Sequence, residues 1–380
     1  MERLYTRIVL YDRDSMNKEA DSKEFFFKLL QAGLWEKAKF SEFNCLVNTV
    51  VDWAEVYRLS EEQSVVGVVL AGIERLKNNI NSISIPQELL LQWIGEVQLL
   101  EQQNKAMNQF IAMLVEKMRN AEDIYTLLVK GQGLAQCYEK PLWRACGDID
   151  FLLSDTNYKM AKAFLLPLSS SHNPEGKYSK HFVMNIESWV VELHGTLRTG
   201  LSGRIDKQVN AVQKDIFYGG NVRSWNNGKT QIFLPSPTED VFLVFTHFIK
   251  HFYKEGMSLR QICDWCRLLW TYRESLNYGN LELWINKAGL MKEWKTFYNL
   301  ASRYLGMPYS DSRLMAHDSR FDKKAERLMA FILGGYSGNK IKDTLQIAKI
   351  FPWKALRYAP SIFLNVNWLK LKERMFIRQR

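Results

Sequence analysis

The amino-acid sequence predicts an α+β protein in which a small mixed β-sheet core is flanked by helical N-terminal and C-terminal regions. Apolar residues recur near the 3.6-residue period of a helix from about Ser22 to Met118. From Ile124 the pattern changes to short β-type runs, and after Pro235 the helical period returns. We therefore expect a helical region over 1–120, a sheet core over 121–235 and a helical region with a basic tail over 236–380.

Three groups of apolar residues carry the helical period of the N-terminal region. They lie within Phe26–Leu30, Val65–Ile73 and Leu89–Leu100. Pro86 stands just ahead of the third group, where a first-turn proline is tolerated because the N–H that it lacks would have no helical partner there. The sequence thus predicts that a helix begins close to this proline.

Four short runs predict the strands around which the centre of the chain is built. Ile124–Lys130 ends at a glycine turn, and Asp148–Leu153 is followed by the helix-start signal Ser154-Asp155-Thr156. His181–Ile186 and Trp189–His194 are separated by only two residues, which predicts a β-hairpin.

A helix-start signal also marks the return to helices. Beyond Ile232–Leu234, Ser236 and Glu239 have the spacing of a capping box, and Pro237 occupies the first helical position. We expect helices from there to the end, with breaks near Gly334-Gly335 and Pro352.

The composition is that of an ordinary folded protein. Of the 380 residues, 47% are hydrophobic and 24% charged, and the high aromatic content, 13%, favours an aromatic-rich core over a ring-binding groove. Neither a secretory signal nor an apolar run long enough to span a bilayer is visible, so we expect a soluble cytoplasmic protein without a transmembrane segment. Five scattered cysteines favour reduced thiols over a disulfide framework.

The excess positive charge is concentrated at the end of the chain. Residues 340–380 contain ten Lys or Arg and only Asp343 and Glu373 as acids, whereas the rest of the chain is close to neutral. This stretch is either a contact surface for nucleic acid or another anionic surface, or a basic helical face in solvent.

Three carboxylates in the predicted sheet have the pattern of a metal site. Asp148 and Asp150 project from the same face of one strand, because side chains at i and i+2 share a face. Their mutual repulsion is relieved by a divalent cation with oxygen ligands. Glu192 becomes a third ligand if its strand lies beside that of the two aspartates. Such a set can hold two Mg²⁺ or Mn²⁺ ions, which neutralise a triphosphate.

A glycine turn ahead of these carboxylates suits phosphate binding. Lys130 leads into Gly131, Gln132 and Gly133 at the start of a short helix, where free backbone N–H groups attract anions. Lys130 and Arg144 are candidate phosphate-binding cations on either side of the turn. Each of these motifs alone is weakly specific, and their order along the chain adds specificity.

These residues together resemble a bacterial nucleotidyltransferase family of the polymerase-beta superfamily. The similarity rests on Lys130-Gly131, the segment Arg144–Leu153 that contains Asp148 and Asp150, and Val191–His194. It extends through the helical N-terminal half and the downstream segments at 237–240, His247, His251 and 260–265. The resemblance implies that Asp148 and Asp150 bind metal, that Glu192 is the third acid and that Gly131 approaches the nucleotide phosphates.

Two positions depart from the superfamily pattern. Gln132 follows the first glycine where the superfamily usually has Gly or Ser, and the third acid is Glu192 rather than the commoner Asp. Both departures bear on phosphate geometry and catalytic rate more than on the fold.

Several further residues are candidates for the pocket. His194 shares a strand face with Glu192, and His247 and His251 lie four apart on a helix without the glutamate of a metalloprotease motif, which favours packing or substrate contact over zinc. Arg260 and Asp264 form either a helix-surface pair or part of the pocket. Cys263 and Cys266 have the spacing of a redox motif, but their helical setting favours packing.

The predicted activity is metal-dependent transfer of a nucleoside monophosphate from an NTP to an acceptor, with release of pyrophosphate. The acceptor stays open among a small molecule, a protein, a sugar and RNA. Two alternatives remain: a catalytically inactive nucleotide-binding or scaffold protein in which Gln132 weakens the phosphate turn, and a metal-dependent phosphoesterase.

Overall fold

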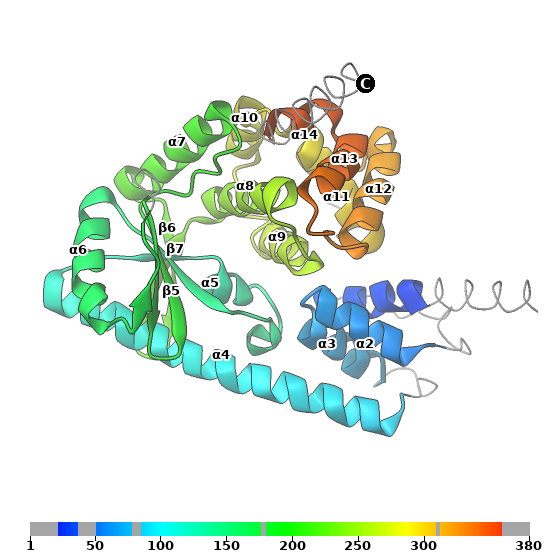
Figure 1. Ribbon diagram of the computed structural model, residues 1–380, viewed down its shortest axis with the longest axis horizontal. Coiled ribbons are helices and arrows are strands. Elements are labelled where there is room, and N and C mark those ends of the chain that lie inside the picture. The colour runs from blue at the N-terminus through cyan, green and yellow to red at the C-terminus, as the bar shows by residue number, and fades with distance from the viewer. Residues whose placement is uncertain (1–21, 37–50, 78–84, 176–179, 309–311, 359–380) are drawn as a thin grey trace, which may run out of the picture.

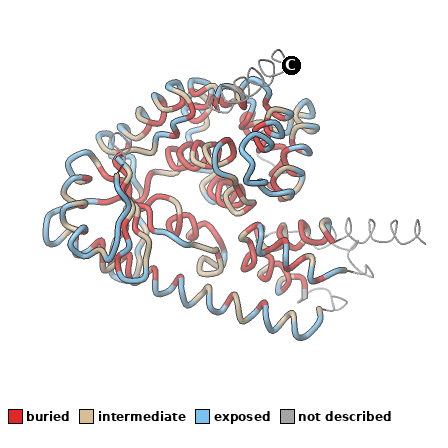
Figure 2. The backbone as a smooth tube through the Cα atoms, viewed as in Figure 1, coloured by how far each residue is buried: buried red, intermediate tan, exposed pale blue. Residues whose placement is uncertain are grey.

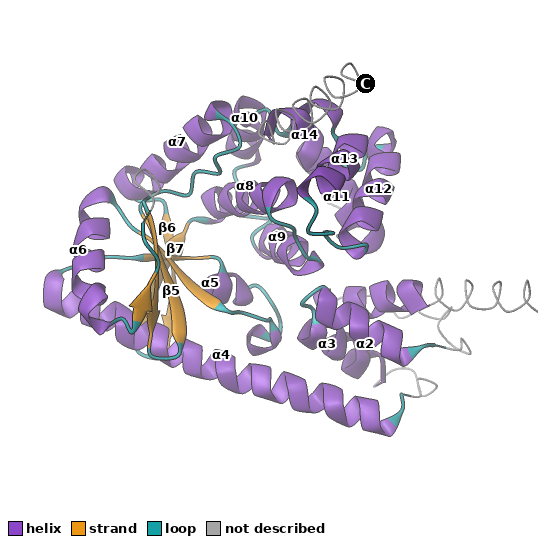
Figure 3. Ribbon diagram, in the orientation of Figure 1, coloured by secondary structure: helices purple, strands orange, loops and turns teal. Residues whose placement is uncertain are grey.

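A computed structural model of the protein describes residues 22–36, 51–77, 85–175, 180–308 and 312–358. It confirms the predicted α+β class: one mixed sheet is surrounded by helices (Figure 3). The strands are β1 Leu127–Val129, β2 Asp148–Leu152, β3 Ser171–His172, β4 His181–Ile186, β5 Trp189–His194, β6 Val222–Asn227 and β7 Thr230–Pro235.

The N-terminal part is helical, as its apolar period predicts. A helix over residues 22–34 is followed by α2 Trp53–Glu62, α3 Val66–Lys77 and the 36-residue α4 Gln87–Glu122. Pro86 is the N-cap of α4, one position before the predicted one. Helix α4 runs from the N-terminal helices to the sheet (Figure 1), so this one element connects the two parts.

The remaining helices follow the first strand. They are α5 Gly131–Ala135, α6 Asp155–Leu165, α7 Gly203–Gly219, α8 Pro237–Lys254, α9 Leu259–Thr271, α10 Tyr278–Ala288, α11 Met291–Tyr304, α12 Asp322–Leu333, α13 Lys340–Ile350 and α14 Pro352–Tyr358. Short 3₁₀ turns are η2 Pro141–Trp143, η3 Leu166–Leu168, η4 Arg313–Met315 and η5 Ser319–Phe321. Ser154 and Ser236 are the N-caps of α6 and α8, which confirms both predicted helix starts.

The sheet has the strand order β3-β4-β5-β2-β1-β7-β6. Strands β4 and β5 form the predicted hairpin, with Ile186 opposite Trp189. Strand β2 pairs parallel with β5 on one side and antiparallel with β1 on the other. The sequence analysis missed β3 and β6. Strand β3 has two residues, too few to show a period. Strand β6 reads Val-Arg-Ser-Trp-Asn-Asn, a largely polar run whose two apolar residues, Val222 and Trp225, are three positions apart and so do not alternate.

The two faces of the sheet have different neighbours (Figure 1). Ile149, Phe151 and Val191 are buried and pack on one face with the second half of α4 and with α6. Figure 2 shows buried stretches in the sheet and in the helices that cover it. The alternate residues of β2 and β5, among them Asp150 and Glu192, therefore point to the opposite face, which lies toward α5 and α8. The apolar alternation of the strands thus fixes the direction of the acidic side chains.

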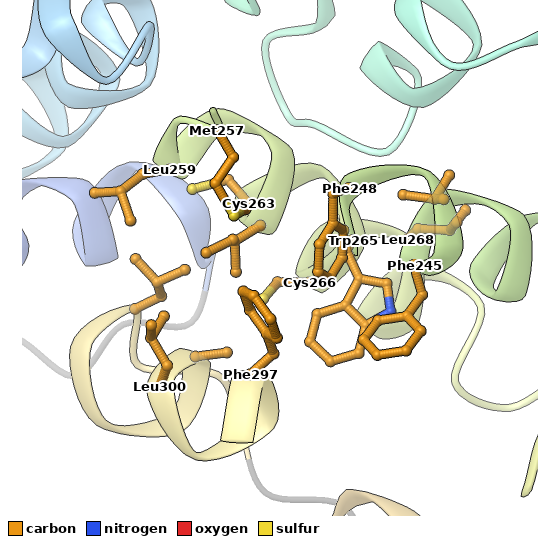
Figure 4. Close-up of a cluster of buried hydrophobic side chains, with 14 of the residues drawn as sticks. Phe245, Phe248, Met257, Leu259, Cys263, Trp265, Cys266, Leu268, Phe297 and Leu300 are labelled. Carbon is orange, nitrogen blue, oxygen red and sulfur yellow. The ribbon is translucent and has the colours of Figure 1, made fainter. Parts of the chain in front are cut away.

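Helices α8, α9 and α11 enclose an aromatic core behind that acidic face. Figure 4 shows Phe245, Phe248, Trp265 and Phe297 in contact around α9, and Trp265 is fully buried. This arrangement agrees with the prediction that the aromatic residues mainly build a core.

The described cysteines, Cys137, Cys146, Cys263 and Cys266, are unpaired. Cys263 and Cys266 are completely buried in α9, and burial raises the pKa of both thiols. A buried thiol of raised pKa is a poor nucleophile, so their role is packing, as their helical setting predicts. Cys45 lies outside the described residues.

The start of the basic tail is folded onto the C-terminal helices. Helices α13 and α14 bury Ile347, Ile350, Phe351 and Tyr358, and Asn339 caps α13. Residues 359–380 lie outside the described part of the chain, so contact of the tail with an anionic surface stays a prediction. No helix among the described residues has the length and apolar character needed to cross a membrane.

Candidate active site

Parallel pairing of β2 with β5 brings the three predicted carboxylates together. Asp150 stands directly opposite Glu192 in the register, and Asp148 is two residues earlier on the same face of β2. One carboxylate oxygen from each of the three residues lies within 4.8 Å of the others. The condition that the sequence left open, adjacency of the two strands, is therefore met.

Lys130 is the cation nearest to these acids. Its Nζ donates to Oδ1 of Asp150 at 2.7 Å, and its side chain is only 17% exposed. The backbone of Lys130 has φ 61° and ψ −149°, a region that residues with a side chain rarely occupy. Gly131 follows with φ 43°, and a Cβ there would lie 3.2 Å from Sγ of Cys146. The chain therefore turns sharply here, and the turn directs the lysine toward Asp150.

Two histidines complete a polar network around the acids. His194 donates from Nε2 to Oδ1 of Asp150 at 2.7 Å, and the same nitrogen lies 3.4 Å from Oε2 of Glu192. His181, directly opposite His194 in the hairpin, donates from Nε2 to Oε2 of Glu192 at 2.9 Å. Two hydrogen bonds and the 3.4 Å contact between His194 and Glu192 thus link the side chains of Asp150, His194, Glu192 and His181.

The surroundings shift the acidity of the three carboxyl groups in different directions. Burial raises the pKa of Asp148, and the charge of Asp150 raises it further. Burial also opposes ionisation of Asp150, but the Lys130 ammonium and the hydrogen bond from His194 hold the pKa of Asp150 below its usual value. At Glu192 the hydrogen bonds from both histidines outweigh burial and lower its pKa strongly. The least compensated of the three charges is therefore that of Asp148.

A cavity of about 750 Å³ opens over this cluster. Lys130, Asp148, Glu192 and His194 lie on the sheet side of its lining, and His247, Lys250 and His251 of α8 line it as well. Nε2 of His251 is hydrogen-bonded to Nε2 of His247 at 2.9 Å, and burial with nearby positive charge keeps the pKa of His247 well below its usual value. His247 is therefore neutral at pH 7. Both histidines line the cavity, a position from which they could contact a substrate, and such contact stays a prediction.

Gln132 and Gly133 lie behind the site rather than in the cavity. Gln132 is 1% exposed, and its Nε2 donates to Oδ1 of Asn104 on α4 at 2.6 Å. Asn104 in turn donates to the carbonyls of Leu142 and Arg144. A Cβ on Gly133 would lie 2.8 Å from a methyl group of Leu234. The side chain at position 132 therefore ties α5 to α4 and does not enter the space where a ligand would lie.

Arg144 and Asp264 form a buried ion pair with each other. Nε and Nη2 of Arg144 donate to the two carboxylate oxygens of Asp264 at 3.0 and 2.6 Å, and the hydroxyl of Tyr138 donates to Oδ1 at 2.8 Å. Arg260 instead donates to the carbonyl of Ala145 at 2.9 Å. No direct pair between Arg260 and Asp264 is found in the described part of the chain: α9 uses both residues to hold the segment that precedes β2, and neither lines the cavity over the acids. A role of the two residues in the pocket stays a prediction.

The residues of the acidic cluster suit a hard divalent cation. Carboxylate oxygens are the ligands that Mg²⁺ and Mn²⁺ prefer, and the raised pKa of Asp148 indicates negative charge that the neighbouring cations do not fully balance. Two ligands of this kind on one strand and a third on its neighbour need no rearrangement of the backbone to converge.

Two residues that hold the site, His181 in the network and Asn104 behind it, were not predicted from the sequence. His181 lies on the same strand pair as Glu192, and its partnership with that residue follows from the hairpin register once the two-residue loop is fixed. Asn104 lies 28 residues before Gln132, and nothing in the local sequence connects them.

Replacement of the two aspartates should affect the stability of the metal-free fold differently. Asp150→Asn leaves the buried Lys130 without its counter-charge and should lower the free energy of unfolding by roughly 1–3 kcal/mol, whereas Asp148→Asn removes a poorly compensated charge and should leave stability equal or higher. Urea unfolding at pH 7 with a chelator measures both. Equal destabilisation by the two changes would contradict this account of the charges.

The pH dependence of that difference follows from the direction of each shift. Because the pKa of Asp150 in the folded protein lies below its usual value of 3.8, ionisation of Asp150 stabilises the fold above that pH. This stabilisation is lost as the pH falls through the lower pKa of the folded state. The contribution of Asp148 to stability depends on pH in the opposite direction. It is present at low pH and is lost as the pH rises through the raised pKa of Asp148. The difference in free energy of unfolding between Asp150→Asn and Asp148→Asn should therefore become smaller below about pH 4.

Arg144 should be needed for stability. Arg144→Met leaves Asp264 buried without its cation, and loss of one partner of a buried pair costs about 3–5 kcal/mol. Arg144→Met combined with Asp264→Leu should recover part of that loss. Glu326→Gln, which breaks the exposed pair with Arg303 at 2.6 Å, is the control and should cost about 1 kcal/mol or less. A stable Arg144→Met protein would instead favour the predicted phosphate-binding role.

Comparison with known proteins supplies the family. No curated protein and no solved structure matches the chain. Residues 49–306, more than half of the chain, match a family described as an uncharacterised nucleotidyltransferase. This span contains the acidic cluster, the Lys130-Gly131 turn and the histidines of the cavity, and the chain belongs to this nucleotidyltransferase family.

Proposed function

We propose that the protein is a metal-dependent nucleotidyltransferase of the polymerase-beta type, which transfers a nucleoside monophosphate from an NTP to an acceptor and releases pyrophosphate. The observation that carries the proposal is the convergence of Asp148, Asp150 and Glu192, of which Asp148 and Glu192 line the cavity, in a chain that belongs to a nucleotidyltransferase family. Asp148, Asp150 and Glu192 would hold two Mg²⁺ or Mn²⁺ ions. When bound, these ions supply positive charge to the triphosphate and to the reacting oxygens.

The side chains around the cluster have separate roles in this proposal. An acceptor oxygen forms a bond to the α-phosphorus, the bond from that phosphorus to the bridging oxygen breaks, and pyrophosphate leaves. As a ligand of the ion at the attacking oxygen, Glu192 would help the acceptor to lose its proton, since its strongly lowered pKa makes the carboxylate itself a weak base. Lys130 and the backbone at Gly131 lie beside Asp150 and provide positive charge and N–H groups for the phosphates.

The far wall of the cavity suits contact with the nucleotide or the acceptor. His247, Lys250 and His251 of α8 and Arg198 of the loop after β5 line it. A second cavity of about 800 Å³ shares Thr196, Arg198 and Asp206 with the first and continues along α7. We propose this continuation as the approach of the acceptor, whose class remains a choice among small molecule, protein, sugar and RNA.

The inactive-scaffold alternative loses its main argument. It depends on Gln132 disturbing phosphate binding, and that side chain is buried against Asn104. We also propose a cytoplasmic location, which fits an NTP substrate and the unpaired cysteines.

Incubation with α-³²P-labelled NTPs, Mg²⁺ and candidate acceptors tests the proposal. Covalent label on an acceptor together with pyrophosphate supports it. Hydrolysis without transfer, for every acceptor offered, would favour a phosphoesterase. Absence of both turnover and NTP binding would contradict the proposal.

Three nearly isosteric changes distinguish the proposed role of the two aspartates from that of Glu192. Asp148→Asn and Asp150→Asn should weaken Mg²⁺-dependent NTP binding as well as turnover, because both residues are proposed to hold the ion that carries the triphosphate. Glu192→Gln should leave NTP affinity nearly intact and lower the rate by roughly 10²-fold or more. Thermal shift with Mg²⁺ and NTP measures binding. Unchanged binding and turnover in Asp150→Asn would remove this residue from the site.

A further inference from the structure

A second group of potential metal ligands lies beside the acidic cluster and contains nitrogen. It consists of His181 on β4 and Glu192 and His194 on β5, with the two histidines directly opposite each other in the hairpin. Their rings are stacked, with centroids 4.6 Å apart and planes 9° from parallel. Parallel rings on neighbouring strands present their Nε2 atoms to the same carboxylate.

The distances within this group are close to those of a tetrahedral site. Zinc–nitrogen and zinc–oxygen bonds of about 2.1 Å place neighbouring ligand atoms of a tetrahedron roughly 3.4 Å apart. Nε2 of His181 lies 2.9 Å from Oε2 of Glu192, and Nε2 of His194 lies 3.4 Å from the same oxygen. All three ligand atoms lie within 4.8 Å of one another. Small side-chain rotations therefore suffice to surround an ion.

The ligand types select a different ion from the one that suits the aspartates. Imidazole nitrogen binds Zn²⁺ and similar transition metals well, whereas Mg²⁺ prefers oxygen. We propose that His181, Glu192 and His194 form a transition-metal site of the Zn²⁺ class, next to the oxygen-only set of Asp148, Asp150 and Glu192. Three protein ligands leave a fourth position open to water or substrate.

The charges around the group permit an ion to enter. Occupation removes His194 from Asp150, but Lys130 remains on that carboxylate at 2.7 Å, so no buried charge loses every partner. The side chain of His181 is 39% exposed, and all three ligands line the cavity. An ion can thus reach the group from solvent without opening the sheet.

Glu192 is the one residue shared with the proposed nucleotidyl-transfer site. Asp148 and Asp150 take no part in the histidine-containing group, and its occupation requires neither NTP nor acceptor. The inference therefore goes beyond the proposed function and can fail or succeed independently of it.

Titration of the full-length, metal-free protein with Zn²⁺ by calorimetry tests the inference. We expect one Zn²⁺ bound at this group, and His181→Ala should weaken binding by at least ~10-fold, since even a supporting residue of a metal site is worth that much. Asp148→Asn should retain Zn²⁺ binding while weakening that of Mg²⁺-NTP. His172→Ala, which changes an exposed histidine on β3 of the same sheet, is the matched control and should bind like the parent.

A second measurement on the unaltered protein does not depend on how the variants fold. X-ray absorption of the Zn²⁺-loaded protein should show two imidazole ligands together with oxygen. Purely oxygen ligation, or loss of binding in His251→Ala but not in His181→Ala, would overturn the inference, the latter by placing the ion on His247 and His251. Unimpaired Zn²⁺ binding in a folded His181→Ala protein would overturn it as well.

Discussion

The site depends on the parallel pairing of β2 with β5. This register sets Asp150 opposite Glu192 and, two residues away on the same face, adds Asp148. A shift of one residue in either strand would turn its polar side chains toward α4 and α6 and its apolar ones toward the cavity. Burial of Ile149, Phe151, Val191 and Leu193 against those helices opposes such a shift. The same apolar packing that stabilises the sheet therefore fixes the positions of the acids.

Three acids at this distance require compensation, and the surrounding elements supply it unequally. Lys130 arrives on a strained turn that precedes α5, and His194 arrives from β5 itself; both contact Oδ1 of Asp150. Asp148 has no such partner: no cationic side chain of the described residues forms a hydrogen bond or ion pair with its carboxylate, and only the more distant charges of Lys130 and Arg260 lower its pKa. This asymmetry distinguishes the two aspartates, although they are two residues apart on one strand. It also leaves Asp148 as the acid whose charge gains most from a bound cation.

The sequence predicts the parts of this arrangement that depend on local pattern. Alternation along Asp148–Leu153 and the two-residue loop after Ile186 give the face of each acid and the hairpin, and the capping signals at Ser154 and Ser236 give the helix starts. Long-range partners lie beyond local pattern. Arg144, predicted to bind phosphate, is paired with Asp264 at a separation of 120 residues, and Gln132 is held by Asn104. Spacing alone predicts only that the three acids repel one another, because neither the approach of Lys130 nor that of His194 to Asp150 follows from it.

The central claim is that the acids of β2 and β5 hold a divalent cation together with a nucleoside triphosphate. Crystals of the full chain grown with Mn²⁺ and a non-hydrolysable NTP analogue would test it by anomalous diffraction. The account predicts a manganese peak in contact with Asp148 and Asp150, with the triphosphate beside it and Lys130 displaced from, or shared with, the phosphates. Clear density for the nucleotide without a manganese peak at these carboxylates would contradict the claim. So would a nucleotide and manganese bound elsewhere on the chain.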